Sequence, residues 1–262
     1  MATAPAKARR MEMFALSDFP MVEPGDKLSE LILTSLSDNG LVLEQGDVLV
    51  LAQKIVSKAE NQYRNLNEVS ASAKALKLAE EVDKDPRLVE LILQESESVV
   101  RQRPGVLIVR HRLGFVHANA GIDQSNIETN EDSPRALLLP VNPDQSAAAL
   151  RVSLEQVAQC RLNIVINDSA GRAWRNGTCG IAIGCAGFEP VQDLVGDHDM
   201  FGNELRVTTV GIADELAAAG SLLMGQAGEA SPVVLIRGAP VQASSSDDAS
   251  LLIRDPAVDL FL

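Results

Sequence analysis

Asp47-Val-Leu-Val-Leu-Ala-Gln-Lys-Ile-Val56 is an almost continuous apolar run, and its branched side chains predict a buried strand. The run leads into the polar stretch Ser57-Lys58-Ala59-Glu60-Asn61. Leucines at helical spacing over 26–37 predict a helix before it. A helix is predicted after it over 70–82. A second helix is predicted from Asp85 to about Val100, because Asp85 is a good N-cap and Pro86 fits a first helical turn.

The rest of the chain is predicted to mix short strands with helices. A strand over 106–109 has an expected hairpin partner over 113–119, and a helix should run from Asp144 or Ser146 to about Cys160. The remaining elements are expected strands over 136–140, 162–166, 205–212 and 232–236, and a helix over 213–223. Hairpins alternate with helix pairs, and no strict strand-helix-strand rhythm is visible. This pattern favours an α+β fold with a mixed sheet.

Composition limits the classes of function. The chain has 262 residues, 46% of them hydrophobic, which is enough for one large domain or two intertwined smaller ones. Its net charge of −13 argues against nucleic acids and anionic membranes as partners. No apolar run approaches the roughly 18–20 residues of a membrane span. The three cysteines lack CxxC spacing, which favours a reducing, cytoplasmic location.

Two polar segments follow apolar runs and carry the clearest chemical signal. They are His117-Ala-Asn-Ala-Gly-Ile-Asp123-Gln-Ser-Asn126 and Asn167-Asp168-Ser169-Ala-Gly-Arg172. Each is expected to be a turn after a strand, with an acid beside hydroxyl or amide groups. Hard divalent cations prefer such oxygen ligands, so the pair predicts a shared Mg²⁺ or Mn²⁺ site that handles phosphates. The alternative is that each acid only caps its own turn.

Basic and glycine-rich segments supply further candidates. Lys54 interrupts an apolar run, where an ammonium group needs an anion such as a phosphate, and Lys58 lies four residues later. A solvated lysine pair, or pairing with Glu60, is the alternative. The loop after the predicted helix, Met224-Gly-Gln-Ala-Gly228, offers backbone N–H groups to phosphates or is only a helix cap. Trp174 is a core anchor, or it helps its two arginine neighbours to meet a flat or anionic substrate.

Six motifs in order resemble those of one family, the coenzyme F420-0:L-glutamate ligases, also called gamma-glutamyl ligases. The resemblance runs from about Phe14 to the C-terminus. The motifs are Gln53-Lys-Ile-Val-Ser-Lys-Ala-Glu60, Ala118-Asn-Ala-Gly-Ile-Asp-Gln-Ser-Asn126, Asn167-Asp-Ser-Ala-Gly-Arg172, Ala182-Ile-Gly184, Ala213-Asp-Glu215 and Leu222-Leu-Met-Gly-Gln226.

The resemblance implies an α+β fold of two intertwined subdomains and a homodimer. It implies that GTP phosphorylates the terminal carboxylate of coenzyme F420-0, and that the amine of L-glutamate then displaces the phosphate to form an amide. Mg²⁺ or Mn²⁺ is the implied metal, and K⁺ is a further candidate cofactor. The alternatives are a related ligase with another acid acceptor, a metal-dependent phosphohydrolase and a non-catalytic nucleotide-binding regulator. The expected layout is a disordered tail over 1–13, a ligase domain over 14–240 and a linker with a C-terminal segment over 241–262, without a fused nitroreductase domain.

The resemblance also implies site residues, and it implies no protein nucleophile. Asp123 and Asp168 match metal-binding acids, and Ser169 and Gln226 match ligands of a second metal. The matching nucleotide-contacting positions are Asp18, Phe19, Pro20, Met21, Gln53, Lys54, Lys58, Asn126, Met224, Gly225, Ala227, Gly228, Glu229, Ala230 and Ser231. The chain departs from the family pattern at Asn61, at Gln226 (a Glu in archaeal relatives) and at Thr178-Cys179-Gly180.

Overall fold

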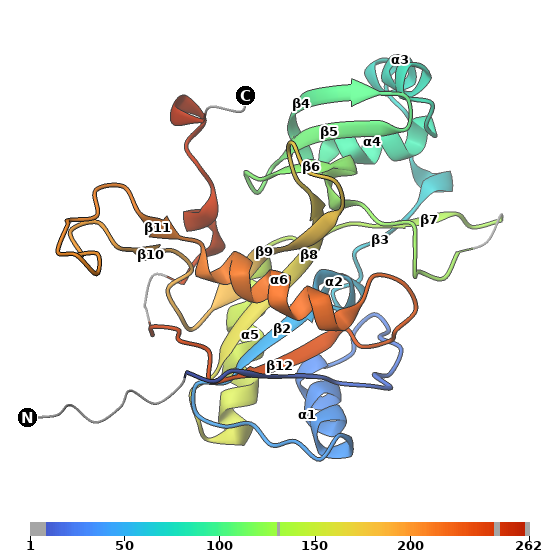
Figure 1. The fold of residues 1–262 in the computed structure, drawn as a ribbon. Coiled ribbons are helices and arrows are strands. Elements are labelled where there is room, and N and C mark those ends of the chain that lie inside the picture. The colour runs from blue at the N-terminus through green and yellow to red at the C-terminus, as the bar shows by residue number, and fades with distance from the viewer. Residues whose placement is uncertain (1–8, 130–131, 244–246, 260–262) are drawn as a thin grey trace, which may run out of the picture.

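A mixed five-stranded sheet forms the centre of the larger lobe in this computed structural model, which describes residues 9–129, 132–243 and 247–259 (Figure 1). Its strand order is β1-β12-β2-β8-β9, and β2 and β8 are the parallel pair. The bounds are β1 Glu12–Ala15, β2 Val48–Ala52, β8 Asn163–Gly171, β9 Thr178–Ala186 and β12 Val233–Arg237. The α+β fold with a mixed sheet is therefore confirmed, whereas the intertwining of subdomains stays a prediction.

Helices cover both faces of this sheet, which explains why β2 is buried on both sides (Figure 1). Alternate side chains of β2 divide between two cores: Leu49 and Leu51 face one, Val48 and Val50 the other. The first core takes its helical side chains from α1 (Leu28–Asp38), α2 (Gln53–Ala59) and α5 (Pro143–Ala158), and the second from α6 (Ile212–Met224). Gly220 lets α6 approach the sheet, because a Cβ there would lie 2.7 Å from a methyl group of Val50.

A second lobe has its own apolar core, formed by two helices and a three-stranded sheet (Figure 1). Ser72 and Asp85 cap its two helices by accepting from the N–H groups of Ala75 and Arg87. The short ladder of β3 and β7 runs between the lobes, with Tyr63 opposite Leu137. The bounds are α3 Ala73–Val82, α4 Pro86–Gln94, β4 Ser96–Arg103, β5 Val106–His111, β6 Val116–Ala118, β3 Tyr63–Asn65 and β7 Arg135–Leu137.

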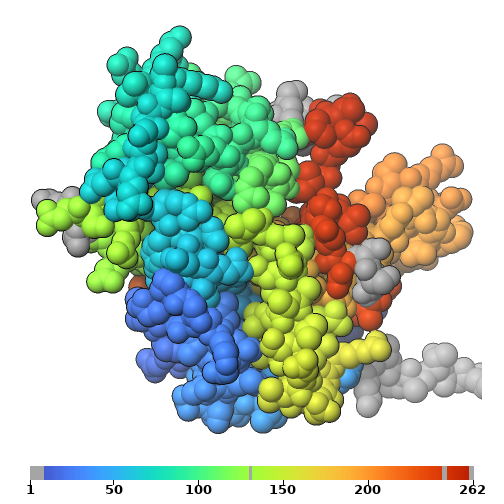
Figure 2. Space-filling view, turned by 180° about the vertical axis from the view of Figure 1, so that it is seen from behind, coloured from blue at the N-terminus to red at the C-terminus, as the bar shows by residue number. Residues whose placement is uncertain are grey.

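The remaining elements are short. The strands β10 (Gln192–Asp193) and β11 (Thr209–Val210) form the base of a hairpin that protrudes from the body (Figure 2). The strand predicted over 205–212 is thus reduced to two residues. The other short elements are α2 Gln53–Ala59 and the 3₁₀ turns η1 Leu66–Glu68, η2 Asn119–Gly121, η3 Ala249–Leu252 and η4 Pro256–Val258.

Several predicted boundaries were wrong, and three of the errors have a plain physical reason. The strand predicted over 47–56 ends at Ala52, and α2 begins at Gln53, because an apolar run alone does not separate a buried strand from a buried helix. The helix predicted to reach Val100 ends at Gln94, since β4 pairs with β5 instead. The strand predicted over 162–166 extends to Gly171, because β9 pairs with its whole length.

Within the described ranges, no helix is long and apolar enough to span a bilayer. The predicted tail lies outside the described residues over 1–8, and the predicted linker and C-terminal segment do so over 244–246 and 260–262.

Candidate functional site

A cavity of about 970 Å³ lies where the carboxyl ends of the parallel strands β2 and β8 meet the loop after β6. Open sheets commonly bind ligands beyond the carboxyl ends of their strands. The cavity also takes in α2, the residues that follow β1 and the loop after α6. Every site residue inferred from the family resemblance lines it except Asp18. The chain therefore brings positions from five separate segments to one place.

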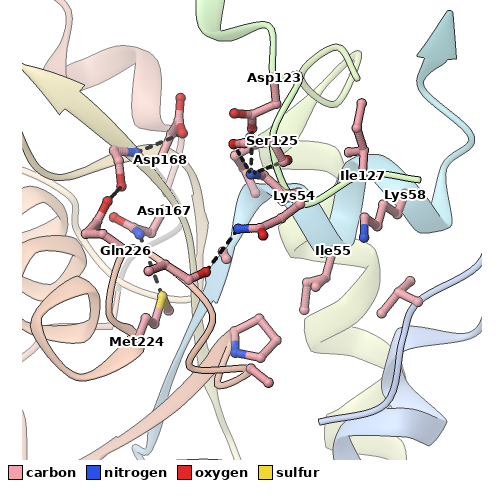
Figure 3. A pocket seen from close by; sticks show the side chains of 18 of the residues that line it. Lys54, Ile55, Lys58, Asp123, Ser125, Ile127, Asn167, Asp168, Met224 and Gln226 are labelled. Carbon is pink, nitrogen blue, oxygen red and sulfur yellow. Dashed lines mark hydrogen bonds and ion pairs between the residues drawn. The ribbon is translucent and has the colours of Figure 1, made fainter. Parts of the chain in front are cut away.

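Asp123 is one of the two acids, and it lies in the loop after η2 (Figure 3). Its Oδ2 accepts a 2.8 Å hydrogen bond from Gln53 Nε2 and lies 3.4 Å from Lys54 Nζ. Burial raises the pKa of Asp123, the charge of Lys54 opposes this, and the charge of Asp168 raises it further. The two predicted acids are thus close enough to repel each other, which favours a cation between them.

Asp168 is the second acid, and it lies within β8 rather than on a turn after it. Its Oδ1 accepts from the backbone N–H of Ser169 at 2.8 Å. Its Oδ2 lies 3.2 Å from Nε2 of the buried His117, but the two atoms are not aligned for a hydrogen bond. Burial lowers the pKa of His117, but Asp168, the carbonyl oxygen of Ala118 and the charge of Asp123 together outweigh burial, and the net direction is upward. His117 therefore lies beside the carboxylate of Asp168 without a hydrogen bond to it.

The donor set at this end of the cavity fits a hard divalent cation. Three buried oxygen atoms lack hydrogen-bond partners here: Asp168 Oδ2, Asn119 Oδ1 and Asn167 Oδ1. Buried acceptors rarely stay unpaired, and carboxylate and amide oxygens are the ligands that Mg²⁺ and Mn²⁺ favour. Across the described part of the chain, no group of three or more His, Cys, Asp and Glu is placed to hold a metal. A cation here would therefore rest on two carboxylates with amide, water or phosphate oxygens.

Ser169 and Gln226, the predicted ligands of a second metal, lie in contact. Ser169 Oγ donates to Gln226 Oε1 at 2.8 Å, and Gln226 Nε2 donates to Ser221 Oγ at 3.0 Å. These two hydrogen bonds fix the amide orientation, with Oε1 toward Ser169 and Nε2 toward Ser221. The fold therefore brings Ser169 and Gln226 together, and the contact between them is a hydrogen bond.

Lys54 and Lys58 lie on α2, one helical turn apart, instead of at the end of a strand as predicted. Lys54 Nζ donates to the carbonyl oxygen of Ser125 at 3.0 Å and neighbours Asp123, so the anion that its partly buried position requires is a protein carboxylate. Lys58 is only 7% exposed. Burial and the charge of Lys54 lower its pKa, and Glu23 opposes them. Its desolvated ammonium lines the cavity and is well placed to meet an anionic ligand.

The loop after α6 turns backbone N–H groups toward one carboxylate. Gly225 has a φ of +73°, a conformation that favours glycine, and Ala227 N donates to Glu229 Oε2 at 2.8 Å. Backbone hydrogen bonds from Ala227 and from Glu229 itself lower the pKa of Glu229. Asn126 Nδ2 donates to the carbonyl oxygen of Ala227 at 3.1 Å and ties the loop to the opposite wall. Amides arranged in this way bind anions, including phosphates.

Among the cavity residues that the sequence reasoning missed, Tyr63 and Arg135 stand together. Arg135 of β7 lies with its guanidinium carbon 5.8 Å from the ring centroid of Tyr63 of β3. Neither residue belongs to a recognisable motif, and only the pairing of two strands far apart in the chain brings them together. Conversely, Trp174 and Cys179 do not line the cavity. Trp174 is exposed, which excludes a core anchor.

Known proteins show clear similarity to this chain. The model of the family described as F420-0:Gamma-glutamyl ligase matches residues 18–238. The coenzyme F420:L-glutamate ligase of Methanothermobacter thermautotrophicus is 41% identical, covering 96% of this chain and 98% of the relative. The protein of the same name from Methanopyrus kandleri is 42% identical over 92% of this chain and 93% of its own length. The one from Archaeoglobus fulgidus is 38% identical, with 90% and 91% covered. The chain belongs to the F420-0:gamma-glutamyl ligase family.

Proposed function

We propose that this protein joins L-glutamate to coenzyme F420-0 by an amide bond, with GTP and a divalent metal, through an acyl phosphate. The observation that carries the proposal is the convergence of Asp123, Asp168 and Lys58 in one cavity of a chain that belongs to this ligase family. In phosphoryl transfer a protein mainly positions the reactants and stabilises charge, which suits a cavity of acids, lysines and loop amides.

The reaction consists of two displacements. A carboxylate oxygen of the acceptor takes the γ-phosphoryl group of GTP, and GDP leaves. The amine of L-glutamate then attacks the acyl carbon, the C–O bond to phosphate breaks, and the nitrogen loses a proton. Amide formation therefore uses the leaving-group ability of phosphate and needs no nucleophile from the protein.

Each protein group has a part in this scheme. Lys58 and the amides of the loop after α6 bind the phosphates, and Lys54 is shared between Asp123 and the phosphates. Asp123 and Asp168 would hold Mg²⁺ or Mn²⁺ with the amide oxygens of Asn119 and Asn167. When bound, the metal neutralises phosphate charge. Gln53 holds the carboxylate of Asp123 by a hydrogen bond, and His117 lies beside that of Asp168.

Product analysis tests the proposal. The purified protein is incubated with F420-0, GTP, Mn²⁺ and L-glutamate, and the products are identified by mass spectrometry. We expect an F420 product heavier by one or more glutamyl residues, formed together with GDP and phosphate. GDP formation without glutamate incorporation would identify a phosphohydrolase instead, and no nucleotide turnover would identify a binding protein.

A further inference from the structure

Behind the wall of the cavity, a buried serine is bonded to the glutamine that holds Asp123. Ser57 Oγ donates to Gln53 Oε1 at 2.9 Å, and Gln53 Nε2 donates to Asp123 Oδ2 at 2.8 Å. Gln53 lines the cavity and is 3% exposed, whereas Ser57 is fully buried and does not line it. A ligand in the cavity can therefore meet Gln53 and Asp123, and Ser57 can act on that ligand only through Gln53.

The two hydrogen bonds decide which end of the Gln53 amide faces the acid. The reverse orientation would set the amide oxygen against a carboxylate oxygen of Asp123, and two acceptors without a proton between them repel. With the nitrogen toward Asp123, the amide oxygen is buried and needs a donor, which the hydroxyl of Ser57 supplies. A serine within a helix commonly donates to the backbone carbonyl four residues earlier, but Ser57 donates to the side chain of that residue.

Gln226, on another wall of the cavity, shows the opposite arrangement. Its Nε2 donates to the hydroxyl of Ser221, which is 6% exposed, and its Oε1 accepts from Ser169. A buried serine can satisfy either end of a glutamine amide, because a hydroxyl both donates and accepts. The acid therefore decides that an N–H group faces Asp123, and the hydroxyl of Ser57 keeps the amide in that position.

The consequence for Asp123 is that one of its two oxygen atoms is already engaged. The hydrogen bond from Gln53 and the 3.4 Å ion pair with Lys54 Nζ both fall on Oδ2, so Oδ1 is the atom left to a cation. A carboxylate that is held at one oxygen keeps a fixed direction toward a cation. Outer hydrogen bonds of this kind raise the affinity of a ligand for its metal.

We infer that Ser57 is a positioning residue of the metal site, which holds Asp123 through the amide of Gln53 with Oδ1 toward the divalent cation. Without the hydroxyl, the buried Oε1 of Gln53 would lack a donor, and the amide would turn away from Asp123 to find one. The inference rests on the proposed function, because the cation at Asp123 and Asp168 belongs to it. It extends that function to a residue that contacts no ligand.

Binding of Mn²⁺ tests the inference without turnover, measured by electron paramagnetic resonance with the protein alone and again with GDP, against protein-free GDP. Ser57→Ala should weaken Mn²⁺ binding about tenfold, the lower end of the range for a lost outer hydrogen bond. Gln53→Met keeps the volume of the side chain but removes both polar ends, and it should weaken binding at least as much. Ser35→Ala is the matched control and should bind like wild type. Ser35 is a 4% exposed serine of α1 outside the cavity, and its Oγ has no hydrogen-bond partner among the described residues.

A double variant separates an action through Gln53 from a general effect of the substitution. If Ser57 acts through the amide, Ser57→Ala should cause no further loss of Mn²⁺ affinity in a Gln53→Met background. Additive losses would overturn the inference, and so would a Ser57→Ala variant that binds Mn²⁺ like wild type.

Failure of the metal site and failure of the proposed function give different results. A wild-type protein that binds Mn²⁺ neither alone nor with GDP would overturn the inference, whatever product analysis shows. Mn²⁺ binding that follows the predicted order, in a protein that adds no glutamate to F420-0, would keep the inference and defeat the proposed function.

Discussion

Asp168 is largely buried, and it lines the cavity as one of the two acids. Its Oδ1 is held by the N–H of Ser169, and its Oδ2 has His117 nearby but no aligned partner. Asp168→Asn can keep the first hydrogen bond, so the fold should persist. Because a neutral amide is a poorer ligand for a hard cation, we expect turnover to fall by about 10²-fold or more. Activity over a Mg²⁺ titration, with circular dichroism as the folding control, measures this. Wild-type turnover at limiting Mg²⁺ would remove Asp168 from the metal site.

Lys58 is the phosphate-binding candidate whose burial argues most directly for a ligand. It is 7% exposed, and burial lowers its pKa. We expect Lys58→Ala to weaken GTP binding by about 1.5–3 kcal/mol, the scale of a charge-assisted hydrogen bond. Isothermal calorimetry measures the affinity, and Lys74→Ala, at an exposed position of α3, controls for the loss of one positive charge. Equal affinity in the two variants would return Lys58 to a structural role.

At the residue scale, the sequence predicted which acids would meet but not what surrounds them. Asp123 and Asp168 could be selected because each follows an apolar run beside small polar residues. The hydrogen bond from Gln53 to Asp123 joins residues 70 positions apart. His117 and Asp168, which lie 3.2 Å apart, belong to strands of two different sheets. No local spacing encodes such contacts. Tyr63 and Arg135 were missed for the same reason.

The loop after α6 is the element whose conformation most directly favours an anion. Its own Glu229 carboxylate accepts from Ala227 N and so competes with a phosphate for the same amide. Glu229→Gln removes that negative charge, and we expect nucleotide affinity to rise several-fold. Calorimetry with GDP compares it with Glu97→Gln, an exposed acid on β4. Weaker binding in Glu229→Gln would mean that Glu229 stabilises the binding-competent loop.

At the element scale, prediction succeeded where one pattern decides the structure and failed where packing decides it. Capping residues predicted the starts of α3 and α4 to within a few positions. The strand predicted around Lys54 was wrong, because the branched residues Ile55 and Val56 suit a strand but lie in a helix that packs into the core. The parallel pairing of β2 with β8 ends at Ala52, and nothing in the local sequence marks that point.

The segment around η3 is attached to the larger lobe by hydrogen bonds to one acid, Asp144. Asp144, in the first turn of α5, accepts from the N–H groups of Cys185 on β9 and Ala249 on η3. It also lies against Asp248, and burial, opposed by those two hydrogen bonds, raises its pKa to about 6. Contact with Ser250 lowers the pKa of Asp248. The shared proton therefore resides on Asp144 at mildly acidic pH.

This contact makes the stability of the whole chain depend on pH. Because the folded pKa of Asp144 exceeds the ordinary value near 3.8, its stabilising contribution is complete at low pH and is lost as pH rises through about 6.

Asp144→Asn keeps an oxygen for both accepted hydrogen bonds and supplies a permanent N–H donor toward Asp248. Since Asp144 is only half-buried, we expect a gain of roughly 1 kcal/mol, or about 2–4 °C in Tm, at pH 7.5. The gain should nearly vanish at pH 4.5, where the wild-type carboxyl is protonated and already donates. Thermal unfolding of both proteins at the two pH values measures the difference, in which all other titrating groups cancel. A gain independent of pH would show that the contact with Asp248 does not hold the proton, and that the segment docks through the Cys185 and Ala249 hydrogen bonds alone.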